Sequence, residues 1–363
     1  MVEGKERTII DYQLQKAKIY PHIAKSYAMW FSSKRISELM DLNTQKILNK
    51  GDFSLLKEIH IHLAGLKAMF TTWTSHGLLK LMQACGGHGF LVSAGIGPII
   101  DKYMSNTILE GENNVLLIQV ARELLKSLDY ANRGEELKLL SSLGYFANIE
   151  KLENHKVSEE KEDWESLKIF KKMFERAIVV MTQKATVKVM GGVEDGLSMK
   201  ASFDKKATFL LTRAAKLHSI LVTFNFFNEK IESLADGPIR AAFQKLSLIF
   251  ILDSLLEESN SLILTGTING AHVRLAKDLF ESLMEQIHVD GLRLAEGWAI
   301  PDILLNSTIG HSNGQVYENL YKMAKENGEF NKVDVQPMML EHLKVRNELL
   351  KSVQENEFLK PKL

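Results

Sequence analysis

Cysteine is nearly absent from this sequence of 363 residues, and neither sign of charge predominates. The single cysteine, Cys85, excludes a disulfide within the chain and a zinc site built from several cysteines. Forty-five Lys and Arg residues balance 45 Asp and Glu residues, so the chain lacks the basic surplus with which nucleic-acid-binding proteins neutralise phosphates. We therefore expect neither a metal centre nor a nucleic-acid partner.

Long hydrophobic runs and targeting segments are also missing. The longest apolar stretch, near residues 246–252, is far shorter than the roughly 20 residues that cross a bilayer. The N-terminus is charged and has no apolar segment typical of a secretory signal, so we expect no membrane span and no secretory leader. The last three residues, Pro361, Lys362 and Leu363, resemble the peroxisomal address Ser-Lys-Leu with proline in place of serine. The alternative is a polar tail without a targeting role.

Helical periodicity fills most of the chain. Only six prolines occur, and apolar residues recur at steps of three and four. The longest such stripe consists of Leu167, Phe170, Phe174, Ala177, Met181 and Ala185. Since alternating runs typical of strands are absent, the sequence predicts an all-α protein.

One segment, residues 149–165, interrupts this periodicity. It is dense in charge and has almost no regularly spaced apolar positions, as in a solvated linker or an exposed helix end. We predict a charged linker there between two helical-bundle domains, residues 1–148 and residues 166–363. Both are ordinary domain sizes.

A glycine-rich motif, Gln-Ala-Cys-Gly-Gly-His-Gly-Phe, occupies residues 83–90. Three glycines in four positions disfavour a helix, so the chain is expected to leave helical geometry here. Such a loop lets backbone amides approach an anion, typically a phosphate. The alternative is a helix C-cap followed by a tight turn.

A second motif, Thr-Ile-Leu-Glu-Gly-Glu-Asn-Asn at residues 107–114, leads into a predicted helix. Asn113 or Asn114 could cap that helix, and the charge of Glu112 suits its positive end. Glu110 follows two apolar residues, and a carboxylate held among apolar groups has a raised pKa and can serve as a general base. Helix capping alone is the alternative for the whole motif.

Together and in this order, the two motifs resemble those of the acyl-CoA oxidases, flavoenzymes of the acyl-CoA dehydrogenase superfamily. Residues 10–31 look like the first helix of that family's flavin domain, and residues 306–310 (Asn-Ser-Thr-Ile-Gly) and 314–320 (Gly-Gln-Val-Tyr-Glu-Asn-Leu) look like its C-terminal signature. The histidine of Gly-Gly-His-Gly and the run Glu-Gly-Glu-Asn are oxidase-like. The chain also continues far beyond Glu110, as oxidases do and the dehydrogenases do not.

The resemblance implies a function and a set of site residues. Glu110 matches the catalytic base, which removes the α-proton of a fatty acyl-CoA; FAD is the cofactor, and O2 is reduced to H2O2 in the first step of peroxisomal β-oxidation. His88 is either a phosphate contact in the glycine loop or a packed histidine. The remaining matched positions are Gln13, Gln83, Gly86 and Gly87, which face the adenosine-diphosphate end of FAD in a neighbouring subunit of a homodimer, and Glu112 and Asn114, which line the flavin.

The sequence also departs from the family. Leu109 stands where an aromatic residue usually precedes the base, and the family's Gly-Arg-Tyr-Asp-Gly is Gly-His-Ser-Asn-Gly at residues 310–314. The family's N-terminal helical and β-barrel domains have no counterpart here. Three interpretations follow: a piece of a longer oxidase, half of a split enzyme completed by a separate N-terminal polypeptide that carries the barrel, or a non-catalytic helical assembly partner without a complete flavin site.

Overall fold

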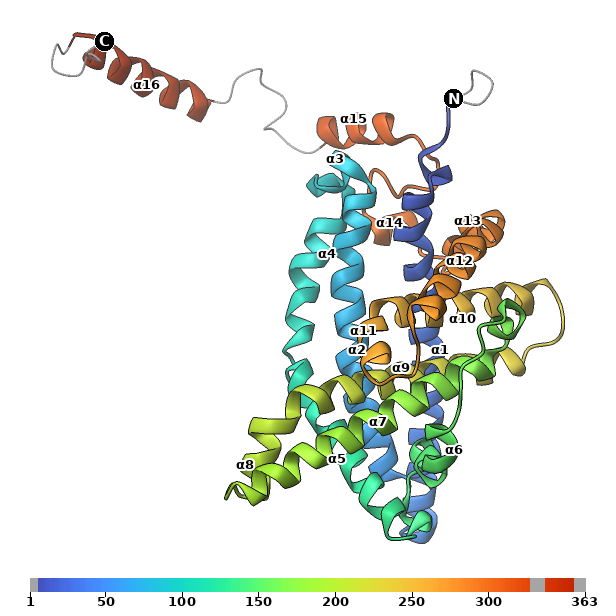
Figure 1. The fold of residues 1–363 in the computed structure, drawn as a ribbon. Helices are drawn as coiled ribbons and strands as arrows, with labels where there is room; N and C mark the ends of the chain where they lie inside the picture. Colours follow the sequence, from blue (N-terminus) through green and yellow to red (C-terminus); the bar gives the residue numbers. More distant parts are fainter. Residues whose placement is uncertain (1–5, 327–336, 356–363) are drawn as a thin grey trace. The chain divides into compact units, whose positions relative to one another are not determined.

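The computed structural model describes residues 6–326 and 337–355, and all regular secondary structure in these ranges is helical (Figure 1). The all-α prediction is confirmed. The α-helices are α1 (Gln13–Lys50), α2 (Leu56–Ala84), α3 (Gly86–Gly89), α4 (Ile96–Tyr103), α5 (Asn113–Asn132), α6 (Ile149–Glu153), α7 (Leu167–Glu194), α8 (Met199–Ser202), α9 (Thr208–Glu232), α10 (Pro238–Glu257), α11 (Ser259–Leu264), α12 (Gly270–Ile287), α13 (Gly291–Glu296), α14 (Asp302–Leu305), α15 (Val316–Glu326) and α16 (Pro337–Glu355).

These helices form two compact units. In the described ranges, the first contains residues 6–86 and 98–299, and the second contains residues 87–97, 300–326 and 337–355. Helices before and after residues 149–165 contribute to one hydrophobic core in the first unit. The boundary at residues 149–165 stays a prediction.

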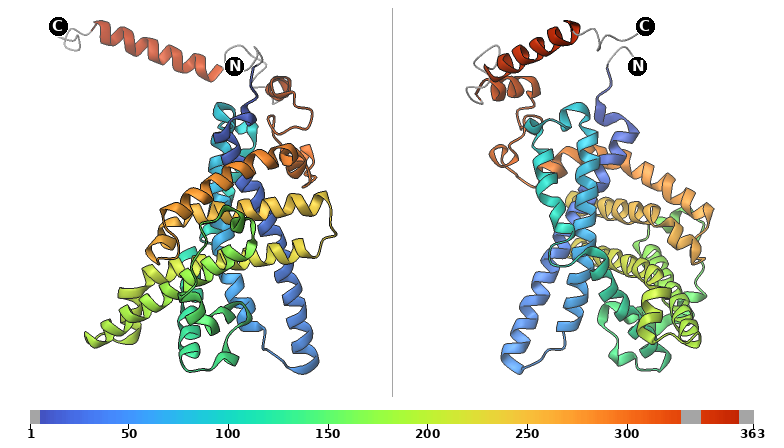
Figure 2. Two further views of the ribbon diagram at one scale, coloured as in Figure 1. Left: turned by 45° about the vertical axis from the view of Figure 1, so that its right-hand side comes forward. Right: turned by 90° about the vertical axis from the view of Figure 1, so that its left-hand side faces the viewer.

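In the first unit, α1 and α2 lie side by side, and α7 and α9 cross them (Figures 1 and 2). The turn between α1 and α2 begins at Gly51, whose φ of 63° is left-handed and whose N–H bonds to Ile47 O at 2.9 Å. Glycine tolerates this conformation because it has no Cβ, so the helix ends here and the chain can reverse.

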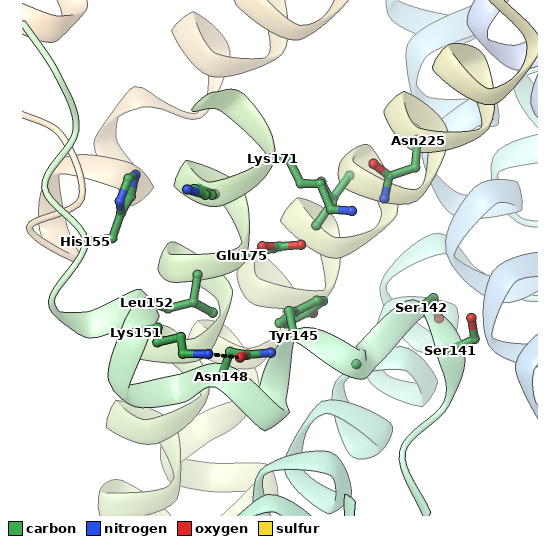
Figure 3. A pocket seen from close by; sticks show the side chains of 13 residues that line it. Ser141, Ser142, Tyr145, Asn148, Lys151, Leu152, His155, Lys171, Glu175 and Asn225 are labelled. Carbon is green, nitrogen blue, oxygen red and sulfur yellow. Dashed lines mark hydrogen bonds between the residues drawn. The ribbon is translucent and has the colours of Figure 1, made fainter. Parts of the chain in front are cut away.

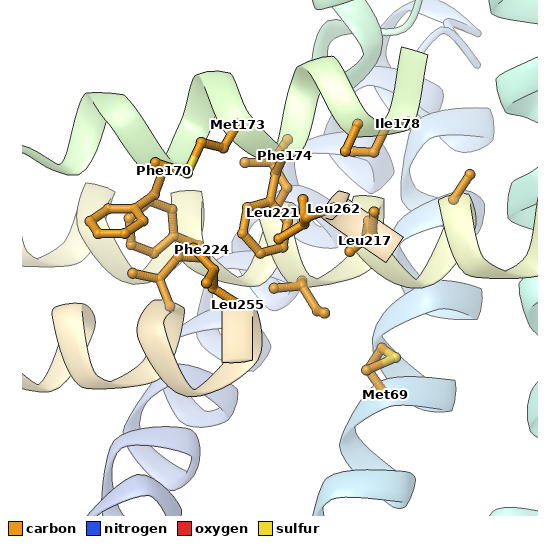
Figure 4. Packing of buried hydrophobic residues seen from close by; sticks show 14 of the residues in the cluster. Met69, Phe170, Met173, Phe174, Ile178, Leu217, Leu221, Phe224, Leu255 and Leu262 are labelled. Carbon is orange, nitrogen blue, oxygen red and sulfur yellow. The ribbon is translucent and has the colours of Figure 1, made fainter. Parts of the chain in front are cut away.

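The core lies where α7 packs on α9 (Figure 4). The predicted stripe of α7 is confirmed there, since Phe170 and Phe174 are fully buried against α9 residues that include Leu221 and Phe224. Burying each such side chain contributes about 1.5–3 kcal/mol, which makes this contact a main source of the unit's stability.

The charged segment before α7 is less solvated than its composition indicates. Trp164 is only 1% exposed, and its indole N–H donates to Ser158 O at 2.8 Å. Its ring lies parallel to that of His272 in α12, with 6.0 Å between the centroids. A single large aromatic residue therefore anchors this polar stretch.

The second unit contains most of α3, the 3-10 helix η2 (Val92–Ala94), the one-turn helix α14, and the longer helices α15 and α16. The predicted targeting residues Pro361, Lys362 and Leu363 lie outside the described residues.

Candidate active site

The Glu110 turn lies between the 3-10 helix η3 (Met104–Thr107) and α5. Glu110 has a left-handed φ of 59°, which few non-glycine residues adopt, and Gly111 follows with φ 114°. The N–H groups of Leu109 and Gly111 bond to Ser105 O and Ile108 O, whereas that of Glu110 has no acceptor among the described residues. Strained backbone of this kind is frequent at functional sites. Here the strained residue, Glu110, carries both a carboxylate and an N–H without an acceptor among the described residues.

Lys67 and Asn113 fix this turn to α2. The Nζ atom of Lys67 donates to Gly111 O at 2.7 Å and to Asn113 Oδ1 at 3.0 Å. Asn113 Nδ2 donates to Thr72 Oγ1 at 3.0 Å, and Thr71 Oγ1 donates to Asn113 Oδ1 at 3.1 Å. Burial lowers the pKa of Lys67, although the charges of Glu110 and Glu112 oppose this effect. The sequence did not predict these anchors, because Asn113 was a candidate cap of α5 and nothing local indicates that its side chain bonds to α2 instead.

Glu112, not Asn113 or Asn114, caps α5. Its Oε2 atom accepts hydrogen bonds from Asn114 N at 3.0 Å and Val115 N at 3.2 Å, and its Oε1 accepts one from Asn114 Nδ2 at 3.0 Å. The asparagine-cap prediction is wrong because Asn113 is committed to α2 and Asn114 already lies inside the helix. A carboxylate at this end also interacts favourably with the helix dipole.

Glu110 is exposed, and so are its apolar neighbours Ile108 (67%) and Leu109 (56%). The prediction that Glu110 is held among apolar groups is therefore wrong for the described residues. No described residue buries the side chains of this turn, which precedes α5. An apolar environment for Glu110 requires another polypeptide segment or the substrate itself.

Gly111 is the position at which this turn is most sensitive. A Cβ there would lie 2.9 Å from Leu116 Cδ2, and φ 114° is strained for any other residue. We expect Gly111→Ala to lower stability by about 1–3 kcal/mol and to increase amide exchange at residues 108–116. Thermal unfolding and hydrogen exchange measure the two effects. Gly134→Ala, with φ 69° and open space around the new Cβ, is the matched control and should cost less; equal losses would contradict a specific role of the Leu116 contact.

The predicted contacts to the adenosine end of FAD gather where α2 ends. The α2 helix stops at Ala84, and Gly86 has φ 61°. Gln15 Nε2 donates to Ala84 O at 2.7 Å, so the start of α1, with Gln13, meets the end of α2, with Gln83. Gln13, Gln83 and Gly86 are exposed, and the side chains of the two glutamines make no hydrogen bond to any described residue.

The glycine motif is one helical turn rather than an open loop. The chain leaves helical geometry at Cys85 and at Gly86, and residues Gly86–Gly89 then form α3. The prediction of non-helical backbone therefore holds at this break and not in the turn that follows it. A Cβ at Gly86 or Gly87 would meet no atom within 4 Å, so the backbone stays open to a bulky ligand. His88 is half-buried, and its ring contacts that of Tyr317 edge-on, with 5.8 Å between the centroids.

Glu110 and the two predicted glutamines, Gln13 and Gln83, lie far apart. Lys67, beneath Glu110, and Gln83 are both in α2, and at about 1.5 Å per residue they lie roughly 24 Å apart along the helix. The two groups of predicted residues therefore cannot touch the same reacting atoms. Exposed amides and an open glycine backbone at one end fit a diphosphate ligand, and the free Glu110 N–H fits a carbonyl oxygen at the other.

A cavity of about 540 Å³ lies elsewhere in the first unit and contains none of the predicted site residues (Figure 3). Glu175 lies near its centre, with Lys171, Asn225 and Tyr145 around it. Burial raises the pKa of Glu175, although Lys171 and Lys172 oppose the effect. We assign no ligand to this cavity.

The described residues contain neither a metal-binding cluster nor a membrane-spanning helix. In residues 6–326 and 337–355, no three His, Cys, Asp or Glu side chains are arranged to hold a metal ion. Within the same ranges, no helix combines the length and hydropathy needed to cross a membrane.

Comparison with known proteins identifies the class. Residues 1–125 match the family model "Acyl-CoA oxidase, C-alpha1 domain", and residues 166–347 match the model "Acyl-CoA oxidase". The chain belongs to the acyl-CoA oxidase family.

Individual relatives agree. The chain is 30% identical over 338 residues to acyl-coenzyme A oxidase acox-1.3 of Caenorhabditis elegans, covering 93% of this chain and 49% of that protein. It is 29% identical over 347 residues to peroxisomal acyl-coenzyme A oxidase 2 of Rattus norvegicus, covering 92% and 50%. The structure of acyl-CoA oxidase-2 of C. elegans, bound with FAD, ascaroside-CoA and ATP, superposes with a TM-score of 0.87 at 28% identity, covering 96% and 51%. The chain spans about half the length of the curated relatives it matches.

Proposed function

We propose that this chain supplies the C-terminal half of an FAD-dependent acyl-CoA oxidase, which converts a fatty acyl-CoA and O2 to the trans-2-enoyl-CoA and H2O2. The observation that carries the proposal is the Glu110 turn, in which one strained residue carries both a carboxylate and an N–H that has no acceptor among the described residues. Capping of α5 does not account for this, because Glu112 alone performs it.

In this proposal Glu110 has two tasks. Its carboxylate takes the α-proton of the thioester, and its N–H donates to the thioester carbonyl oxygen, where negative charge develops. Lys67 and Asn113 hold the turn so that both groups stay aligned without reorganisation during the reaction. FAD, when bound, accepts the hydride that leaves the β-carbon.

The other predicted residues have binding roles. The adenosine-diphosphate end of FAD would be held by Gln13, Gln83, Gly86 and Gly87, with His88 next to them in sequence. In a homodimer, this FAD would be the one bound by the neighbouring subunit. Glu112 and Asn114 would border the flavin, where Glu112 also keeps the end of α5 in place. The two residues of this last pair already bond to each other, which leaves them fewer free polar atoms for the cofactor.

The location and the remaining half of the protein complete the proposal. We place the enzyme in the peroxisome, supported by relatives whose names are peroxisomal. The exposed apolar residues beside Glu110 support a covering segment. By the family resemblance, this segment would be an N-terminal region with a β-barrel, either in the same polypeptide or contributed by a separate one.

The test is the composition of the native assembly. We would capture it from its source with an antibody to residues 208–257, measure the intact mass of the chain, and record the flavin spectrum before and after anaerobic addition of a fatty acyl-CoA. We expect bound FAD that is bleached by acyl-CoA, with H2O2 formed when O2 is admitted. An assembly without flavin would instead support the non-catalytic helical partner.

A further inference from the structure

The C-terminal signature, residues 306–310 and 314–320, has no task in the proposed reaction. Its first part contacts the segment that follows the glycine turn, inside the second compact unit. Thr308 N donates to Ser93 O at 2.8 Å, and Thr308 Oγ1 donates to the same oxygen at 3.1 Å. Ser307 Oγ donates to Ala94 O at 2.6 Å. Thr308 is only 4% exposed, so its two bonds to Ser93 O are shielded from water, whereas Ser307 is half-buried.

The two segments also approach closely through their backbones. Gly95 has φ 78°, and a Cβ there would lie 3.0 Å from Leu305 O and 3.1 Å from Asn306 O. Asn306 itself is left-handed, with φ 44°. Asp302 and Ser312 flank the first part of the signature, residues 306–310. The Asp302 carboxylate accepts hydrogen bonds from Ser312 N at 2.9 Å and Ser312 Oγ at 2.6 Å. The Asp302–Ser312 contact thus joins the two ends of the stretch that contains residues 306–310.

The second part of the signature reaches the glycine turn directly. Tyr317, in α15, contacts the His88 ring of α3 edge-on, at an interplanar angle of 80°. His88 O in turn accepts a hydrogen bond from Leu91 N at 3.1 Å, which links the turn to the segment held by Ser307 and Thr308. Both parts of the signature therefore act on one stretch, residues 87–95, named here the glycine segment.

We propose that Ser307 and Thr308 are positioning residues that hold the glycine segment in the conformation that binds the diphosphate end of FAD. The inference rests on the proposed function. Glycine-rich backbone loses more conformational entropy on ordering than any other. If the glycine segment were flexible before FAD binds, this entropy loss would weaken the affinity for FAD. The hydroxyl bonds of Ser307 and Thr308 order it in advance.

The test uses the native assembly with the double substitution Ser307→Ala and Thr308→Val, which removes both hydroxyl groups and keeps the Thr308 N–H bond. We expect amide exchange in residues 87–95 to rise and the Kd for FAD to increase about tenfold, with kcat at saturating FAD unchanged. The single substitution Thr308→Ser, with Ser307 unchanged, keeps the hydroxyl at residue 308. It should leave both the amide exchange of residues 87–95 and the Kd for FAD near those of the wild type. Ser233→Ala removes a similar hydroxyl bond, to Lys230 O at 2.7 Å, and is the matched control.

The outcomes separate the two proposals. Faster exchange with an unchanged Kd for FAD would overturn the positioning role and leave the proposed function intact. Unchanged exchange would overturn it as well. A wild-type assembly that binds no FAD would overturn the proposed function and this inference with it.

Discussion

Glu110→Gln in the native assembly is expected to bind fatty acyl-CoA and to lose flavin reduction by about 10²- to 10⁴-fold. The amide keeps the size of the side chain and the N–H of residue 110, but it cannot accept the α-proton. Because the backbone geometry of the turn depends on Gly111, Lys67 and Asn113, the structure of the site should survive the change. Stopped-flow absorbance under anaerobic conditions measures the rate, and a ligand titration measures binding.

Two companion variants sharpen this experiment. Glu110→Asp keeps a carboxylate on a shorter side chain and should retain more of the rate than Glu110→Gln. Asp101→Asn removes an exposed negative charge in α4 and should leave reduction unchanged. Flavin reduction at the wild-type rate in Glu110→Gln would remove Glu110 from the reaction.

Lys25→Met is expected to destabilise the chain by about 3–5 kcal/mol. Lys25 is 2% exposed, and its Nζ lies 2.6 Å from Asp253 Oδ2 and 3.2 Å from Glu257 Oε1. Burial opposes the charge on Lys25, yet the two carboxylates raise its pKa. Methionine fills a similar volume but leaves Asp253, whose side chain is 17% exposed, without its ion-pair partner. Urea denaturation followed by circular dichroism measures the loss.

The control for this prediction removes both charges. In Lys25→Met with Asp253→Leu no buried charge is left unpaired, and Glu257 keeps Lys80 at 3.7 Å. The double variant should therefore be more stable than Lys25→Met alone. A single variant within about 1 kcal/mol of the wild type, as for exposed pairs, would show that the cluster is not insulated from water.

The fold was largely predictable because helical periodicity is a local property. The stripe that contains Phe170 and Phe174 follows from a period of 3.6 residues, and the structure buries it. Packing partners are not encoded in that period. The burial of Trp164 inside a charged stretch depends on Ser158 and on His272, more than a hundred positions further along the chain, and no local pattern indicates it.

The break in helical backbone at the glycine motif was also predictable, whereas the local contacts of the second motif were not. Gly86 and Gly111 do adopt left-handed backbone, as glycine at such positions permits. The cap of α5 was assigned to an asparagine because asparagine is a favoured capping residue. The Asn113 side chain instead forms hydrogen bonds with Lys67, Thr71 and Thr72. These bonds can form only when α2 lies beside the turn.

By itself, the sequence determined the helical class, the oxidase-like motifs and their order along the chain, since these depend on residue type and spacing. The tertiary structure alone decided three further properties. The N–H of Glu110 finds no acceptor in the described part of the chain, and Lys67, which contacts the Glu110 turn, lies far from Gln83 along α2. Ser307 and Thr308 bond to residues more than two hundred positions earlier. These properties depend on the distance between atoms remote in sequence. Such distances are set only when the apolar faces pack and the buried polar groups find partners.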